Sequence, residues 1–114
     1  MKDTVVFLDL SASTDTRVKT LDAIAEVDEF GKPFSAEVLW FRRLIGAEDS
    51  GMVFEALKNR HISYTYSDEV DALTFSFGDG AQSSGQVPVT LILEFKDYNL
   101  LALTLHEIEA FGQN

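Results

Sequence analysis

Apolar side chains recur at every second position over several short stretches of the chain, which is typical of strands that bury one face. In the first stretch, Thr4–Leu10, Val6 and Leu8 share one face and Phe7 takes the other. The further stretches are Leu21–Val27, Pro33–Ile45, Ile62–Tyr66, Ala72–Phe77, Val87–Phe95 and Leu100–Ile108. We therefore expect a protein rich in β-structure.

One further segment, Thr16–Thr20, alternates charged and apolar residues. In Thr16–Thr20, Arg17 and Lys19 alternate with Val18. Charges on an edge strand discourage unwanted pairing with other sheets. This segment therefore predicts a short edge strand, followed by Leu21–Val27 as a separate strand.

Two tight turns join neighbouring strands into hairpins. In the first, Phe30-Gly31 forms the turn, because glycine takes a positive φ at little steric cost. Pro33 then opens the following strand, which is one of the few strand positions that tolerate proline. Lys96–Asn99 makes the corresponding turn late in the sequence.

The strand that Pro33 opens ends in apolar residues on both of its faces. Good helix formers in Ala36–Ile45 offer a competing helix, but the hairpin turn and the aromatic content favour a strand. One face of this strand end can enter the core, and the other then remains exposed. Exposed aromatic residues and arginine favour association, so we expect a homodimer. The candidate apolar interface consists of Trp40, Phe41, Leu44 and Ile45.

One segment changes to helical spacing. Val53, Ala56 and Leu57 recur at intervals that place them on one face of a helix. Acidic residues lie at the front of this segment and basic residues at its back, which suits the helix dipole. We predict one helix over 47–60, with Asp49 or Ser50 as its N-cap.

The two parts of the chain on either side of this helix carry similar patterns. Inward residues of three strands in the first part match those of three strands in the second, in the same order. The matched groups are Val6, Leu8 and Leu10 with Leu73, Phe75 and Phe77; Ala23, Ala25 and Val27 with Leu91, Leu93 and Phe95; and Phe34, Ala36 and Val38 with Leu101, Leu103 and Leu105. The predicted fold is a single α+β domain over 1–114. Its two similar antiparallel β-meander units, approximately 1–45 and 62–111, are joined by one short helix and share one core.

Composition narrows the classes of function. Of the 114 residues 46% are apolar, which suffices for a real core, and none is cysteine. The chain therefore forms no disulfide and no thiolate metal site, and it suits a reducing compartment. No apolar run approaches the length of about 18 residues that spans a bilayer, and the N-terminus has no signal-peptide pattern. We expect a soluble, cytoplasmic protein.

An excess of acidic residues bears on which partners the surface accepts. The formal net charge is −10 and the pI is near 4.4. Such a surface repels nucleic-acid backbones and anionic membranes and attracts basic proteins. We therefore expect no nucleic acid and no membrane as partners, and a basic protein as the candidate partner. The alternative is that the acidity only keeps a small domain soluble.

The first hairpin and one later strand carry a resemblance to a known family. Val27–Leu39 follows the hairpin pattern Leu-Asp-x-Asp-Gly-x-Leu-Val-Gly-Ile-Glu-Ile-Leu, including Asp28, Gly31 and Glu37, and Tyr66–Leu73 follows the opening Tyr-Asp-x-x-x-Asp-Ala-Leu. Each half of the chain thus resembles the uncharacterised prokaryotic family called domain of unknown function 2283, in two tandem copies. The resemblance implies a small β-rich domain with no established activity or catalytic residues, and a toxin-like protein as partner.

Acidic residues gather at the first hairpin. The candidate acidic partner surface consists of Glu26, Asp28, Glu29 and Glu37. Paired carboxylates can serve general acid–base catalysis, but they need a cleft, which a solvated hairpin tip does not provide. His106 and Glu109 have the spacing of a metal-ligand pair only in a helix, and this segment predicts a strand. We expect no catalytic residue, no metal site and no cofactor.

No P-loop, dinucleotide fingerprint or basic aromatic patch is present in the sequence. The leading hypothesis is therefore a small acidic protein that is not an enzyme, a protein–protein interaction module that binds a basic, toxin-like partner. The alternative is a homo-oligomeric structural or small-ligand-binding β module with a pocket between its two halves.

Overall fold

The computed structural model describes residues 3–9, 15–78 and 82–108, which form seven strands and two helices. In chain order these are β1 (Asp3–Leu8), β2 (Arg17–Val27), β3 (Pro33–Leu39), α1 (Phe41–Ile45), α2 (Ala47–Asn59), β4 (Ser63–Ser67), β5 (Ala72–Ser76), β6 (Gly85–Lys96) and β7 (Asn99–Glu107). Helix α2 lies where the sequence predicts a helix, whereas α1 replaces the end of a predicted strand. Leu10 and Glu109, named above, lie outside the described residues.

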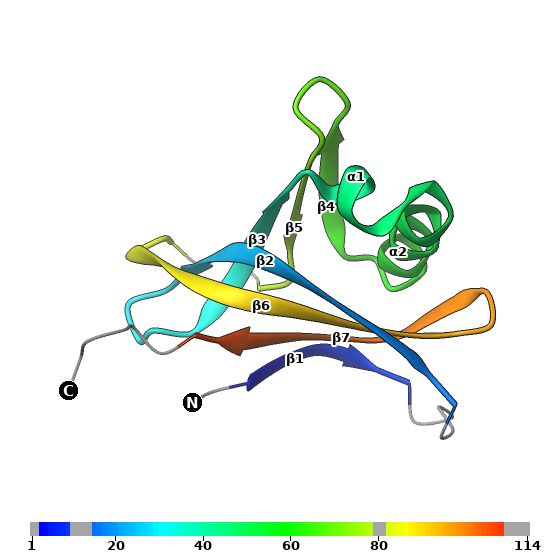
Figure 1. The fold of residues 1–114 in the computed structure, drawn as a ribbon. Coiled ribbons are helices and arrows are strands. Elements are labelled where there is room, and N and C mark those ends of the chain that lie inside the picture. Colours follow the sequence, from blue (N-terminus) through cyan, green and yellow to red (C-terminus); the bar gives the residue numbers. More distant parts are fainter. Residues whose placement is uncertain (1–2, 10–14, 79–81, 109–114) are drawn as a thin grey trace.

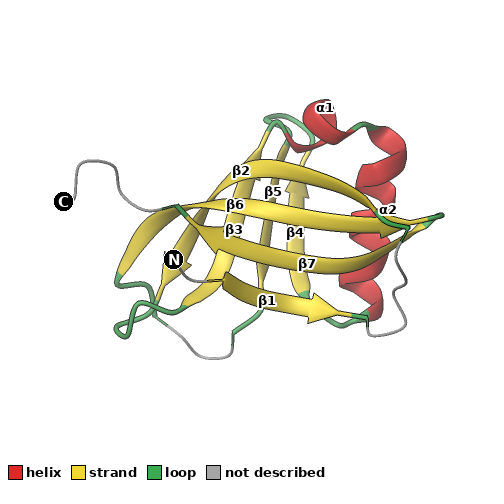
Figure 2. Cartoon of the chain, turned by 60° about the horizontal axis from the view of Figure 1, so that its bottom comes forward, coloured by secondary structure: helices red, strands yellow, loops and turns green. Residues whose placement is uncertain are grey.

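All seven of these strands belong to one antiparallel sheet, in the order β1-β7-β6-β2-β3-β5-β4. The sheet curves into a half-barrel: β3, β5 and β4 rise away from β6, β7 and β1, and the helices lie in the angle between them (Figures 1 and 2). The α+β class is thus as predicted. The strands do not pair as two consecutive meanders, because β1 lies beside β7 and β5 lies beside β3.

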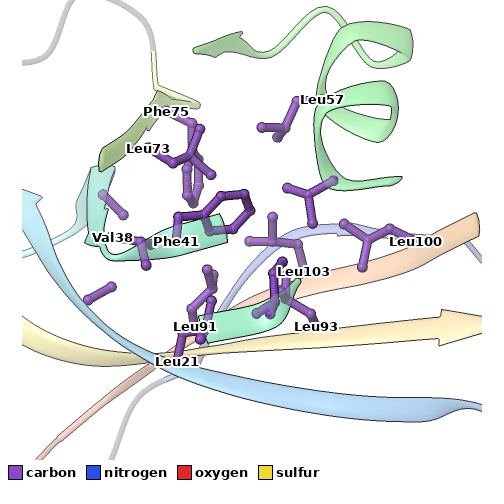
Figure 3. Close-up of a cluster of buried hydrophobic side chains, with 14 of the residues drawn as sticks. Leu21, Val38, Phe41, Leu57, Leu73, Phe75, Leu91, Leu93, Leu100 and Leu103 are labelled. Carbon is purple, nitrogen blue, oxygen red and sulfur yellow. The ribbon is translucent and has the colours of Figure 1, made fainter. Parts of the chain in front are cut away.

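The core lies between the sheet and the helices that cover it (Figure 3). Strand β6 alternates as predicted, and its fully buried inward side chains are Val89, Leu91, Leu93 and Phe95. Helix α2 adds the buried side chains of Val53 and Leu57 from the opposite side. Complete burial of one such side chain contributes about 1.5–3 kcal/mol, so this contact between sheet and helix holds the half-barrel to α2.

Strand β1 departs from the predicted alternation. Its pairing with β7 shifts by one residue between Val5 and Phe7, so Val6 is the extra residue of a β-bulge. A bulge places one unpaired residue in the strand and reverses the alternation that follows it. Phe7 therefore packs against the core together with Val6, and Leu8, which we predicted to face inward, is exposed.

The predicted edge strand does not exist as a separate element. Thr16–Thr20 and the strand after it form most of a single strand, β2, which lies inside the sheet and pairs with β6 along its whole length. Arg17 and Lys19 occupy inward positions of β2, in the same alternation as the buried Leu21. The prediction was wrong because the countercharge for these cations comes from a helix distant in the sequence.

Asp49 of helix α2 supplies that countercharge. Its two carboxylate oxygens accept hydrogen bonds of 3.2 Å from the Arg17 guanidinium, and Lys19 Nζ lies 2.7 Å from Oδ2. Hydrogen bonding from Arg17 outweighs the burial of the carboxylate and lowers the pKa of Asp49. The predicted N-cap is wrong, because α2 begins at Ala47 and both candidate residues lie inside the helix. Asp49 instead connects the first turn of α2 to β2, and the Ser50 hydroxyl donates a hydrogen bond to the backbone oxygen of Gly46.

Replacing Asp49 with Asn should destabilise the protein, because two cations on β2 lose their carboxylate. We expect urea unfolding at pH 7 to show a loss of about 2 kcal/mol, as for other hydrogen bonds to charged groups. Since folding lowers the pKa of Asp49, its contribution is complete above the unfolded value of 3.8 and fades as the pH falls through the lower folded value. The difference between wild type and D49N should therefore shrink below pH 3.8. Glu48→Gln, an exposed neighbour, is the control, and a pH-independent difference would contradict this account.

Two glycines should respond in opposite ways to the same substitution. A Cβ at Gly78 would lie 2.7 Å from the Cβ of Phe34, which is anchored to the backbone. Gly78→Ala should therefore lower the free energy of unfolding by about 1–3 kcal/mol. A Cβ at Gly51 of α2 meets nothing within 4 Å, so Gly51→Ala should raise it by about 0.5–1 kcal/mol. Urea unfolding checks both, and a stabilised G78A would refute the close contact.

Candidate functional site: an apolar groove with acidic neighbours

Strand β3 leaves β2 after four residue pairs, and this divergence shapes the candidate site. The pairs run from Ile24 and Glu37 to Val27 and Pro33. Beyond them β3 continues beside β5, so within the described sheet the first part of β2 has only β6 as a neighbouring strand. Helix α1 lies beside this part of β2, since Lys19 Nζ donates a 3.0 Å hydrogen bond to the backbone oxygen at the end of α1.

The chain turns from β3 into α1 at Trp40, whose backbone is left-handed with φ 61° and ψ 33°. The predicted strand end is therefore wrong, and Phe41–Ile45 is a short helix. A helix places residues four apart on the same side, so Phe41 and Ile45 are buried. Trp40 and Leu44 lie on the other side and are 53% and 57% exposed. Half of the predicted apolar interface thus belongs to the core.

The N-terminus of α1 is capped by a residue from another part of the chain. Its own N-cap residue makes no side-chain cap bond. Asp71, in the turn between β4 and β5, accepts the backbone N–H groups of Arg42 and Arg43 with its carboxylate at 2.9 and 3.0 Å. Its backbone oxygen accepts the N–H of Phe41 at 3.0 Å. These bonds satisfy donors that a helix terminus leaves unpaired, so Asp71 fixes α1 in place.

The Tyr66 side chain supports this cap. Its hydroxyl donates a 2.6 Å hydrogen bond to the Asp71 carboxylate. Partial burial opposes ionisation of Asp71, but this bond and those from the two backbone amides prevail and lower its pKa, while the same bond raises the pKa of Tyr66. The Tyr66 ring also packs against Phe41 and Phe54, with centroids 6.5 and 5.3 Å away. Cap and aromatic cluster together hold α1 against β4.

A groove of about 500 Å³ opens where α1 meets the outward side of the sheet. The buried residues Ala23 and Val89 form part of its lining. Its exposed apolar lining consists of Ile24, Leu39, Trp40, Leu44, Pro88 and Ile108. All of these except Pro88 are large side chains with exposed fractions of 43–57%. Exposed apolar residues scattered singly are ordinary, but residues that line one depression mark a site of interaction.

The polar residues that line this groove are both acidic, Asp22 and Glu37. Outward positions of β2 and β3 also carry Glu26, and none of them carries lysine or arginine. The two basic residues of β2 face inward, so the charges of this strand are separated by sign. On α1, the Arg43 guanidinium lies 5.0 Å from the centre of the Trp40 ring, where it covers part of the indole face.

The four acids predicted as a partner surface do not form one cluster. Glu26 and Glu37 are diagonal neighbours on the outward side of β2 and β3. One carboxylate oxygen of Asp28 accepts two backbone N–H groups of the turn at 2.9 Å each, so this side chain shapes the hairpin. Glu29 is exposed in the turn. Of the four, Glu37 lines the groove.

A second cleft, of about 630 Å³, lies between β1 on one side and β4 and β5 on the other. Arg60 occupies part of its wall, with its guanidinium 4.0 Å from the centre of the Phe7 ring.

In the part of the chain that is described, no group of three or more His, Cys, Asp or Glu could hold a metal ion. His106 pairs with Asp3 across β7 and β1. No described helix has the length and hydropathy to cross a membrane.

A comparison with protein-family models, curated proteins and solved structures returns no significant match to the chain. The resemblance to domain of unknown function 2283 therefore stays a prediction that rests on the hairpin residues. Any function of the groove has to be inferred from its own geometry and charge.

Several residues that shape the groove are not among the predicted site residues, and they include Asp22, Ile24 and Asp71. Ile24 does carry a signal, because it is an apolar residue at the outward position of an alternating strand. Asp71 carries none, since its role depends on backbone amides 28 and 29 residues earlier in the chain.

Asp71→Asn should loosen α1, because the cap loses its charge. We expect the free energy of unfolding to fall by about 1 kcal/mol, as for other N-cap residues. Trp40 is the only tryptophan and adjoins α1, so its fluorescence should change in D71N. Glu69→Gln is the matched control, since Glu69 lies in the same turn and is exposed. Equal stability and emission in the two variants would show that the cap does not hold α1.

Proposed function

We propose that this protein is a non-enzymatic protein–protein interaction module that binds a basic partner protein through its acidic outward surface. The observation that carries the proposal is the groove, an exposed apolar depression whose polar lining is Asp22 and Glu37. Association surfaces combine an apolar centre with a polar border. Complementary charge at that border steers the partner and excludes partners of the wrong sign.

The charge of the whole chain supports the same partner class. A net charge of −10 attracts a basic protein over distances longer than a contact. The resemblance to domain of unknown function 2283 suggests a toxin-like protein as this partner. As part of the proposal we place the encounter in the cytoplasm, where reducing conditions suit a chain without cysteine.

A homo-oligomeric structural or small-ligand-binding module is the second candidate, and the groove is again the observation in its favour. Its apolar residues could pack against a second copy, and about 500 Å³ also falls in the range of small-molecule sites. A symmetric dimer, however, brings the same patch of both copies together. Asp22 and Glu37 of each copy would then lie near those of the other, which costs free energy at low salt.

The internal repeat belongs to the same proposal. We propose that residues 1–45 and 62–111 are two copies of one unit that exchange strands. In this repeat β1 corresponds to β5, β2 to β6 and β3 to β7. When each strand is replaced by its counterpart, the sheet order β1-β7-β6-β2-β3-β5 becomes the same order read backwards. A two-fold axis through the paired β2 and β6 has this effect. The groove uses α1, which lies in the first unit, so among the described residues the function of the groove would belong to that unit.

Co-purification from the native host tests the proposed function. A single basic protein should bind the tagged protein at close to one-to-one stoichiometry at low salt, and it should dissociate as salt rises because salt screens the charges. The sequence predicts a homodimer, but Phe41 and Ile45 of its predicted interface are buried and the groove carries like charges. We propose instead that the pure protein is a monomer at low salt, which light scattering during size exclusion checks. Absence of any basic partner at every salt concentration would overturn the proposal. A dimer that persists unchanged from low to high salt would establish the second candidate.

A further inference from the structure

We infer that the groove between α1 and the outward side of β2 is the docking site for one basic amphipathic helix of the partner protein. The inference rests on the proposed function and adds where and by what chemistry the partner binds. Apolar side chains of that helix enter beside Ile24, Trp40 and Leu44, and its lysine or arginine residues lie beside Asp22 and Glu37.

The position of the groove in the sheet decides between a helix and a strand as the occupant. An added strand needs a free sheet edge with unpaired backbone groups. The end strands of the described sheet, β1 and β4, do not line the groove, and of the stretch of β2 that β3 leaves unpaired only Asp22 and Ala23 line it. These two residues are fewer than the roughly three to ten that a strand usually spans. The groove therefore offers mainly side chains, and the binding mode that uses side chains is an amphipathic helix in an apolar groove.

Charge decides between a basic partner and a second copy of this chain. Both polar residues of the groove are acidic, and Glu26 adds a third carboxylate on the same outward side. A second copy would bring its own carboxylates to this border, whereas a basic helix neutralises them. Charge complementarity therefore selects a basic helix of another protein.

Trp40 provides an independent observation at the same place. A left-handed backbone costs a residue other than glycine about 1–2 kcal/mol, and Trp40 has φ 61°. Trp40 is 53% exposed although the Arg43 guanidinium covers part of its ring, so much of the residue stays open to a partner. Strained residues persist where a ligand uses them, and tryptophan is among the residues that dominate binding energy at protein interfaces.

Fluorescence of Trp40, the only tryptophan in the chain, tests the inference. The probe is a tryptophan-free peptide of about 15 residues, long enough to form a helix, with leucine on one face and lysine on the other. Its titration should shift the Trp40 emission to shorter wavelength and saturate. Raising the ionic strength from about 0.01 M to about 0.15 M, which shortens the Debye length from about 30 Å to about 8 Å, should weaken the affinity at least tenfold. A scrambled peptide of the same composition should not saturate.

Two pairs of variants locate the binding site. Leu44→Ser removes an apolar groove residue, and Val18→Ser is its control, because Val18 is 55% exposed on the same side of β2 outside the groove. Glu37→Gln removes a groove charge. Glu94→Gln is its control, because Glu94 pairs with Val18 across β6 and β2 and so lies on the same outward side of the sheet, outside the groove. We expect L44S and E37Q each to raise Kd by about fivefold or more and the controls to change it by less than about twofold. Urea unfolding verifies that all four variants fold.

The outcomes separate this inference from the proposed function. If calorimetric titration of the same peptide shows salt-sensitive binding that is equal in all four variants, while the Trp40 emission stays unchanged, the docking site is overturned and the proposed function stands. If the peptide does not bind at low salt, the docking inference is overturned, and co-purification decides the proposed function separately. If the emission shifts with protein concentration alone and light scattering shows a dimer, the occupant is a second copy and the inference is overturned.

Discussion

The pairing of β2 is the constraint on which the rest of the structure depends. This strand pairs with β6 along its whole length but with β3 through four residue pairs only, so the sheet has to divide there. Both helices contact β2 where the sheet divides. Asp49 of α2 neutralises the inward cations of β2, and α1 lies beside the part of β2 that β3 does not pair. Core and groove are two sides of one junction, because α1 turns Phe41 inward and Leu44 outward.

Much of the fold could be predicted from the local sequence pattern, because a strand that buries one face carries apolar residues at alternate positions. The inward positions of β6, the inward Tyr64 and Tyr66 of β4, and the left-handed Gly31 of the first turn could all be predicted. The helical spacing that predicts a helix over 47–60 corresponds to α2 at 47–59. For the site, the sequence indicates Trp40 and Leu44 as exposed apolar residues, although it groups them with residues that are buried.

The rest of the fold could not be predicted, because it depends on partners far away in the sequence. The bulge at Val6 is set by its register with β7. The inward direction of Arg17 depends on Asp49, 32 residues later. A segment as short as α1 shows too few apolar positions to separate a helix from a strand, and its helical form depends on the carboxylate of Asp71. Each of these wrong predictions comes from a contact with a residue distant in the sequence, which the local pattern cannot show.

An exposed apolar groove is a liability for a monomer, since it invites self-association. The acidic residues beside this groove oppose that outcome, because every copy of the chain presents the same sign of charge at the same place. In the complex that we propose with a basic helix, the same residues would lower the free energy of binding, so one arrangement would both disfavour a second copy and favour the proposed partner. The cap at Asp71 and the aromatic contacts of Tyr66 fix α1 before any partner arrives. Binding therefore does not have to order the groove, and less of the interaction free energy is lost.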